Sequence, residues 1–533
     1  MKRAAQPLSS EEIGFLIGLA SVIFGAGLYL YPPALAGFPV NDGGLFYSMV
    51  RAIQQNGYRL PEYVQYNGLR IPFAYPPLGF YIGAFISTIL AIDPLRVIQW
   101  FPAVVLIGTS IAFYFLAKTI LRSPIEAGIA TFLYVCTPRS MTMLVMGGGL
   151  TRSLGQLFLI LTATFVLSLF RERRSGFLIL SIAFGALVVL THPEATVHAV
   201  AACALLWLLE GRSHRGTVDA LIVAFAVAAV SAVWWLPALL QIGIAPFASA
   251  AQTGLHASIL FVYPFMLTFT QEPAMTLIAC LGLIGVAASL AQRRYLLPLW
   301  ALLPFAVEPR DAATVAVIPL ALLGAVALHE VVFPGIYAVR SRSAGGSGGN
   351  YLSSRTAWIL GGYLALFLLV MGIYAASLLA QLQVSKANRA AFEWVSSNTP
   401  PQSRFLILTG ETEPFCDPLQ EWFPVLSRRI SQTTIQGYEW ASNGAFFARV
   451  ADLQGMQRCL TEDSPLQCVK NAASAMGVTY DYIYLPKRAA TTQMCRPTGQ
   501  VSPSTALSMQ LGQDAAFQSV YQTADAEIFA AHR

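Results

Sequence analysis

The feature of this sequence that most constrains its fold is a series of long apolar stretches between Ile13 and Ala380. Each stretch runs for about 17 to 25 residues, and at about 1.5 Å per residue a helix of that length crosses the ~30 Å hydrocarbon core of a bilayer. The stretches do not alternate apolar with polar residues, as the strands of a membrane barrel would. The sequence therefore predicts a polytopic α-helical membrane protein with about eleven, and at most about thirteen, transmembrane helices.

The distribution of charge supports this fold class and orients the chain. Hydrophobic residues make up 56% of the sequence and charged residues 11%, against about 25% charged residues in soluble domains. The net charge of +6 comes largely from short basic clusters between the apolar stretches, at Lys118–Arg122, Arg171–Arg174, Arg212–Arg215, Arg293–Arg294 and Arg340–Arg355. Such clusters mark cytoplasmic loops, so no nucleic-acid partner is expected and the N-terminus is predicted to be cytoplasmic.

Two apolar stretches do not fit this alternation as full crossings. They are Tyr75 to Ile92 and Ser258 to Thr270, and we expect both to be juxtamembrane or re-entrant. The first stretch after Lys2-Arg3 has no small-residue cleavage site and reads as an uncleaved first helix. Compact loops without eukaryotic retention signals suggest a multi-pass protein of a bacterial plasma membrane.

The composition becomes polar after Gln381, which divides the chain into a transmembrane domain, 1–380, and a soluble domain, 381–533. The basic clusters predict that the second domain is exoplasmic. Helical patterns at 388–397 and 465–476 alternate with strand patterns at 404–409 and 480–485. This alternation favours an α/β domain.

Four cysteines lie in the soluble domain, namely Cys416, Cys459, Cys468 and Cys495. An even number of cysteines outside the cytoplasm favours disulfides, and four cysteines allow three pairings. Unpaired thiols are the alternative. A zinc site is disfavoured because the domain has no Cys-x-x-Cys pair.

Ionisable residues beside spanning helices cost about 2.5 to 3.5 kcal/mol each to insert, so each needs a reason. In the predicted topology these residues share the exoplasmic helix ends, and they are Asp42, Arg139, Arg152, His192, Glu194, Glu308, Arg310 and Asp311. We expect them to converge on one cavity. Structural alternatives exist: Asp42 could only cap the helix that follows it, and Glu308 with Arg310 could be a local ion pair.

Other polar features have weaker functional interpretations. The run Gly147–Gly149 is too short for a phosphate loop and lacks the Gly-Lys-Ser/Thr ending. Four histidines have no second ligand at metal-binding spacing and are interpreted as structural, namely His198, His214, His256 and His329.

Three motifs resemble the GT-C superfamily of membrane glycosyltransferases, which includes protein O-mannosyltransferases, aminoarabinose transferases and catalytic subunits of oligosaccharyltransferases. The first outer loop, 37–74, opens with Asn41-Asp42-Gly43-Gly44, and it leads into Phe73-Ala74-Tyr75-Pro76-Pro77-Leu78-Gly79. The soluble domain opens with a helix-like segment at 391–401. Family members often carry two acids at the first-loop position, whereas Asp42 stands alone.

The resemblance implies transfer of a sugar from a polyprenyl-phosphate donor to a lipid, glycan or protein acceptor on the exoplasmic side. In that scheme Asp42 is the catalytic base, and Arg152 and Arg310 hold the departing phosphate. The remaining substrate-binding candidates are Tyr75, Arg139, His192, Glu194, Glu308 and Asp311. No cofactor is certain, and a divalent metal stays open. The Asp42→Asn variant is expected to fold and to lose transfer.

Two other functions remain as alternatives to a transferase. Many helices with polar residues near them also suit a membrane transporter. The single acid of the first loop also suits a noncatalytic assembly subunit.

Overall fold

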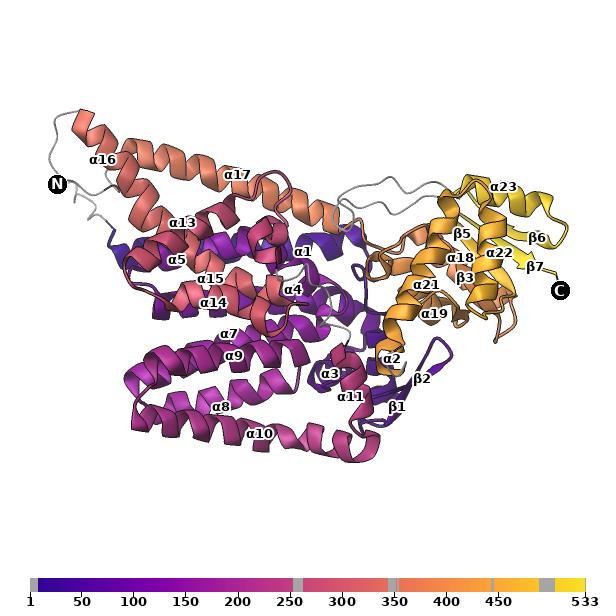
Figure 1. Cartoon of the computed structure of the whole chain (residues 1–533), viewed down its shortest axis with the longest axis horizontal. Helices are drawn as coiled ribbons and strands as arrows, with labels where there is room; N and C mark the ends of the chain where they lie inside the picture. The colour runs from indigo at the N-terminus through magenta and orange to yellow at the C-terminus, as the bar shows by residue number, and fades with distance from the viewer. Residues whose placement is uncertain are drawn as a thin grey trace.

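The computed structural model of this chain describes residues 8–252, 262–343, 351, 354–441, 445–487 and 504–532. These residues are mostly helical. Figure 1 shows a long bundle of helices with a sheet-containing C-terminal domain beside one of its ends. We call this end of the bundle the domain end.

Within the described ranges, seven helices are long and apolar enough to cross a membrane. They are α1 (Ser10–Ala36), α4 (Pro94–Ile120), α7 (Gly149–Glu172), α9 (Pro193–Glu210), α10 (His214–Ile242), the continuous helix Ala312–Val339, and α17 (Arg355–Leu379). The continuous helix comprises α15 (Ala312–Val326), the π-helical turn η4 (Ala327–Val332) and the start of α16 (Phe333–Ser343). Five shorter apolar helices are α3 (Leu78–Leu90), α5 (Pro124–Cys136), α8 (Ser175–Val189), α13 (Leu277–Ala291) and α14 (Leu296–Val307).

Helix α15 forms the centre of the bundle, since all of its residues are buried. By contrast, only 11% of the apolar window of α10 and 22% of that of α17 is buried inside the protein. Helices that expose apolar faces in this way meet lipid in a bilayer. The chain is therefore a membrane protein, as the apolar stretches predicted.

The helix ends next to the basic clusters at 118–122, 171–174, 212–215 and 293–294 lie at the end of the bundle opposite to the C-terminal domain (Figure 1). Arg171 links three helix ends there, because its guanidinium donates to the Thr119 carbonyl at 2.6 Å and pairs with Glu210 at 2.9 Å. Lys118 pairs with Glu11 of the first helix at 3.2 Å. The loops with clustered arginines thus share one side, as the charge pattern requires.

Helix α3 begins and ends at the domain end. The Leu78 amide donates to the carbonyl of Leu190, which follows α8, and Asp93 caps the start of α4 with a bond of 2.8 Å to the Leu95 amide. Both ends of α3 therefore lie on the same side of the bundle (Figure 1). This helix matches the predicted juxtamembrane stretch Tyr75 to Ile92. Of the second such stretch, Ser258 to Thr270, residues 258–261 lie outside the described ranges.

The first loop is folded. It contains helix α2 (Gly44–Gln55) and an antiparallel hairpin of β1 (Tyr63–Tyr66) and β2 (Leu69–Pro72). Asn67 and Gly68 turn this hairpin with φ of 51° and 72°, which are the positive values that a two-residue hairpin turn requires. This hairpin was not among the elements predicted from the sequence, although Asn-Gly is its usual local signal.

The C-terminal domain has a five-stranded sheet in the order β4-β3-β5-β7-β6. Strands β3 (Arg404–Ile407), β4 (Ile430–Ser431) and β5 (Tyr482–Pro486) are parallel, while β6 (Phe517–Gln522) and β7 (Ala526–Ala531) are antiparallel. Its helices are α18 (Lys386–Asn398), α19 (Pro418–Ser427), α20 (Tyr438–Ala441), α21 (Phe446–Arg458), α22 (Pro465–Ala475) and α23 (Thr505–Gln513). Successive residues of β3 face different cores, since Phe405 packs with Trp422 and Leu406 with Met456.

Disulfides form in this domain. Cys459 and Cys468 are bonded to each other, and Cys416 is also disulfide-bonded. Cys495 lies outside the described residues. The disulfide interpretation of the sequence is therefore confirmed for three of the four cysteines.

Candidate active site

Asp42 follows α1 at the domain end and is held by α7 and the turn before it. Its Oδ1 accepts the Gly148 amide at 2.8 Å, and its Oδ2 lies 2.5 Å from Nη2 of Arg152. The side chains of Arg152 and Asp42 are 18% and 23% exposed. Helix α2 has no side-chain cap, so the capping alternative for Asp42 is wrong.

The run Gly147–Gly149 allows this contact because it lets the backbone approach the ion pair closely. A Cβ on Gly147 would collide with the backbone carbonyl of Asp42. A Cβ on Gly148 would collide with the guanidinium of Arg152. The glycine run thus serves close packing around an acid and a base.

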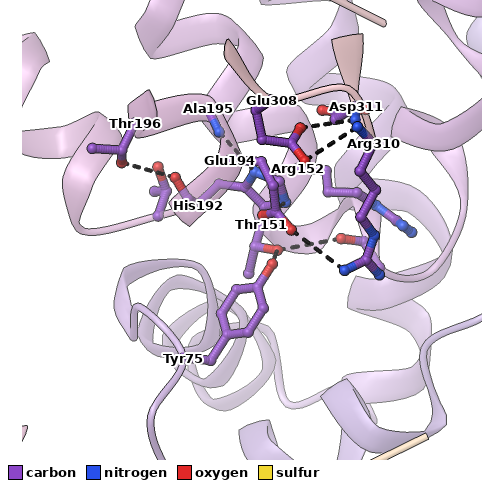
Figure 2. Close-up of polar contacts among 12 residues, drawn as sticks. Tyr75, Thr151, Arg152, His192, Glu194, Ala195, Thr196, Glu308, Arg310 and Asp311 are labelled. Carbon is purple, nitrogen blue, oxygen red and sulfur yellow. Dashed lines mark hydrogen bonds and ion pairs between the residues drawn. The ribbon is translucent and has the colours of Figure 1, made fainter. Parts of the chain in front are cut away.

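A second charged group lies beside the first, at the start of α9 and before α15. Arg310 Nη1 lies 3.8 Å from Glu194 Oε1. The carboxylate of Glu308 accepts the amides of Arg310 and Asp311 at 3.2 and 2.9 Å, which fixes the turn that carries them. Figure 2 shows Arg310 and Glu194 directed toward each other beside Arg152 and Tyr75.

His192 caps α9, because its Nδ1 accepts the Ala195 amide at 3.3 Å. An accepting Nδ1 places the ring proton of the neutral imidazole on Nε2, and this atom lies 3.4 Å from Glu194 Oε2. His198 lies one turn after Glu194 on α9, with its Nε2 at 3.5 Å from Glu308 Oε2. From the sequence alone, His198 was interpreted as structural. Its position four residues after Glu194, on the same helix face, could have linked it to the site.

Tyr75 forms one wall of the site. Its hydroxyl lies 3.3 Å from Thr151 Oγ1, next to Arg152, and its ring packs against His192 and Trp440 with centroids 6.2 and 5.8 Å apart. Arg139 contacts a different residue of this region: its Nε donates to Thr314, on the first turn of α15, at 3.1 Å. The structure thus gathers eight of the nine candidate residues, while Arg139 contacts the first turn of α15, the helix that follows Asp311.

The C-terminal domain contributes residues that sequence reasoning did not assign to the site. Glu421 Oε1 accepts the Gly43 amide, and Trp422 Nε1 donates to the Asn41 carbonyl, each at 2.8 Å. Burial, followed by the Asp42 carboxylate, raises the pKa of Glu421 to about 8. These contacts join positions about 380 residues apart, so no local pattern could reveal them.

The residues around Asp42 do not fit a resident metal ion. Its two oxygens already face the Gly148 amide and the Arg152 guanidinium. Among the residues that the structure describes, no group of three or more His, Cys, Asp or Glu side chains is placed to hold a metal.

Comparison with known proteins adds a family match and several structural neighbours. Residues 74–303 match the model of a family described as a 6-pyruvoyl-tetrahydropterin synthase related domain and as a membrane protein. No curated protein matches the chain.

Three proteins whose solved structures resemble this chain are membrane glycosyltransferases. ArnT from Cupriavidus metallidurans, bound to undecaprenyl phosphate, has a TM-score of 0.55 and 12% identity, with 96% of this chain and 97% of that chain covered. The Archaeoglobus fulgidus oligosaccharyltransferase with a tethered acceptor peptide has a TM-score of 0.51 and 13% identity, with 88% and 69% covered. The arabinofuranosyltransferase AftD from Mycobacteria has a TM-score of 0.53 and 15% identity, with 96% of this chain but 40% of that chain covered.

These neighbours are GT-C glycosyltransferases, so the resemblance that the motifs suggested is confirmed at the level of the fold. The identities of 12 to 15% carry the likeness no further than architecture, because one fold can host different functions.

Proposed function

We propose that this protein is a membrane glycosyltransferase that moves a sugar from a polyprenyl-phosphate donor to an acceptor on the exoplasmic side. The observation that carries the proposal is the pairing of Asp42 with Arg152, beside Arg310 and Glu194, at the domain end of a GT-C fold. The neighbours support a lipid-linked donor, since ArnT was solved with undecaprenyl phosphate and the archaeal oligosaccharyltransferase with a dolichol-phosphate.

The proposed topology has eleven spans. They are the seven long helices and four of the five shorter ones, α5, α8, α13 and α14, whereas α3 lies at the membrane boundary. With the basic loops in the cytoplasm, the N-terminus is cytoplasmic and the site and C-terminal domain are exoplasmic. A bacterial plasma membrane fits this arrangement.

In the proposed reaction Asp42 takes the proton of an acceptor hydroxyl as its oxygen bonds to the anomeric carbon. The bond between that carbon and the phosphate oxygen breaks, and the electron pair leaves with the polyprenyl phosphate. A positioned base contributes about 10² to 10⁴-fold to such a step. Arg152 orients the Asp42 carboxylate through their ion pair.

Arg310 is the better candidate for the departing phosphate. Its side chain is 43% exposed, against 18% for Arg152. A guanidinium offers forked donors that match phosphate oxygens, and charge-assisted bonds are roughly twice as strong as neutral ones. Glu308 fixes the Arg310 turn, while His192, Glu194 and Tyr75 line the donor side.

A small, open apolar depression is the place that we propose for the donor's lipid chain. It is lined by Tyr58, Tyr81, Ile82 and Phe85, at the junction of the first loop and α3. The Phe85 side chain is exposed, as a surface that meets hydrocarbon would be. The phosphate would then stay at the interface while the chain lies in lipid.

The test is transfer by the purified protein in proteoliposomes with a panel of polyprenyl-phosphate sugars, measured as release of the polyprenyl phosphate. Arg310→Ala should lower the rate about 10- to 100-fold, since hydrogen bonds to charged groups contribute about 1.5 to 3 kcal/mol. Arg59→Ala, an exposed arginine of the first loop, is the matched control.

Two other results would replace this proposal. Solute uptake by the vesicles without consumption of any lipid-linked sugar would identify a transporter. An assembly subunit would show neither sugar transfer nor solute uptake. It would co-purify stably with a second membrane protein, and cells would tolerate Arg310→Ala.

A further inference from the structure

The C-terminal domain contacts both peptide groups that flank Asp42. Trp422 donates its indole N–H to the carbonyl of Asn41, and Glu421 accepts the amide of Gly43, each over 2.8 Å. These two side chains are neighbours on α19. The domain also accepts the Asn41 side-chain amide on the carbonyl of Phe415, at 2.8 Å. Asp42 is therefore bracketed on both sides by one helix of the other domain.

The bracketed backbone has a conformation that needs external support. Asn41 has a φ of 53° and Gly43 a φ of 125°. For Asn41 this left-handed backbone costs about 1 to 3 kcal/mol and persists only where surrounding contacts fix it, whereas glycine at position 43 adopts a positive φ without a steric penalty. Two backbone hydrogen bonds also fix this segment. The Asn41 amide donates to the Leu382 carbonyl at 2.7 Å, and the Gly147 amide donates to the Val40 carbonyl at 2.9 Å.

The bracket is buried and tightly packed. Trp422 is fully buried and meets Phe38 edge to face, with ring centroids 4.9 Å apart. The carbonyl of Glu421 accepts the Tyr66 hydroxyl at 2.7 Å, which ties the hairpin of the first loop to α19. A Cβ on Gly44 would lie 2.5 Å from that same carbonyl oxygen, so α19 packs directly on the start of α2.

We infer that Glu421 and Trp422 are positioning residues for Asp42, and that the C-terminal domain completes the active site rather than only covering it. This inference rests on the proposed function, in which Asp42 is the base. Neither residue touches the reacting atoms. Both act by fixing where the Asp42 carboxylate points, and a misplacement of about 1 Å can cost an enzyme about 10²-fold in rate.

The charges around Glu421 add a pH dependence to this positioning. It faces Asp42 from the first loop, Arg152 from α7, Glu439 from α20 and Tyr66 from β1. Because burial and Asp42 raise the pKa of Glu421 to about 8, Glu421 is largely protonated at neutral pH. Above that pH a second negative charge forms beside Asp42 and repels it.

The first experiment needs no enzymatic activity. Hydrogen exchange of first-loop peptides that contain residues 38–50 is compared between wild type, Glu421→Ala, Trp422→Phe and Glu393→Ala in nanodiscs. Glu393 is an exposed residue of α18 in the same domain and serves as the control. Glu421→Ala and Trp422→Phe should raise exchange around Asn41 to Gly44 while the membrane helices keep wild-type protection, and Glu393→Ala should change neither.

The second experiment measures transfer by the same variants. Glu421→Ala should lower kcat about 10- to 100-fold with little change in the KM for the donor. Glu421→Gln should restore most of that loss, because its amide oxygen still accepts the Gly43 amide. If ionisation of Glu421 lowers the rate at alkaline pH, the rate of Glu421→Gln should decline less at high pH than that of wild type. A purely structural role of Glu421 would leave the two pH–rate profiles parallel.

Wild-type exchange in the first loop of both Glu421→Ala and Trp422→Phe would overturn the inference, as would an unchanged kcat in both. If Glu421→Ala does not fold, Trp422→Phe and Glu421→Gln decide. A wild-type protein that transfers no sugar refutes the proposed function instead, and the exchange data then judge the bracket around Asp42 alone.

Discussion

The ion pair between Asp42 and Arg152 makes Asp42→Asn a test of stability as well as of catalysis. The sequence alone led us to expect that asparagine would leave folding intact. In the structure Asp42 is the partner of a guanidinium that is 18% exposed, at 2.5 Å. Asparagine keeps an acceptor for the Gly148 amide but leaves Arg152 without its countercharge.

The size of the effect follows from burial. Breaking a buried ion pair by removing one partner costs about 3 to 5 kcal/mol, because the remaining charge is left without compensation. Both side chains retain some contact with solvent, at 18% and 23% exposure. We therefore expect a loss near the lower end of that range, about 3 kcal/mol.

A double-mutant cycle measures this coupling. Asp42→Asn, Arg152→Gln and the double variant are unfolded in mixed micelles, with tryptophan fluorescence as the signal. Each single variant should be destabilised, and the double variant should lose clearly less than the sum of the two. Coupling between groups in contact is about 0.5 to 3 kcal/mol.

The same variants separate folding from chemistry. The double variant should regain stability yet remain inactive, because it still lacks the carboxylate that takes the acceptor's proton. Additive stabilities, with Asp42→Asn as stable as wild type, would refute the structural role of the pair. Transfer at the wild-type rate in the double variant would refute Asp42 as the base.

Three further predictions follow from the site. Gly148→Ala should lower transfer and destabilise the protein by about 1 to 3 kcal/mol, the usual cost of overpacking, because its Cβ meets Arg152 and Asp42; Gly362→Ala, where a Cβ meets nothing within 4 Å, should do neither. Glu421→Gln should gain stability relative to wild type as pH rises from about 5 to 9. Folding raises the pKa of the Glu421 carboxyl from 4.5 to about 8, so wild type loses stability across that window as the carboxyl ionises, whereas glutamine does not ionise. Parallel curves of stability against pH for the two proteins would contradict this. Chelation with EDTA should leave transfer within about twofold, since Arg152 already neutralises Asp42; loss of activity that added Mg²⁺ or Mn²⁺ restores would show that a cation takes part.

The charged and polar candidates show how much of the site local sequence can predict. Asp42, Arg152, Glu194 and Arg310 were found because each stands at a helix end where an ionisable group is costly. Their roles stay predictions until the variants are measured. The spacing of His198 from Glu194, one helical turn, is a local signal that could have added His198 to the candidates.

The partners of these residues depended on tertiary structure. Glu308 with Arg310 had a local ion pair as its structural alternative, yet the Glu308 carboxylate accepts two backbone amides and Arg310 reaches toward Glu194 on another helix. The acid and base of the first pair are 110 residues apart. Which charge meets which is decided by how the helices pack, and no pattern within one helix encodes it.

The sequence by itself determined that the chain is a helical membrane protein, which loops share a side, and that an α/β domain follows. It could do so because a spanning helix satisfies its own backbone hydrogen bonds, so its length, apolarity and flanking charge are readable locally. Only the tertiary structure decided that Glu421 and Trp422 hold the loop of Asp42. Those contacts join positions 378 and 381 residues apart, and they exist only once the second domain has docked on the first.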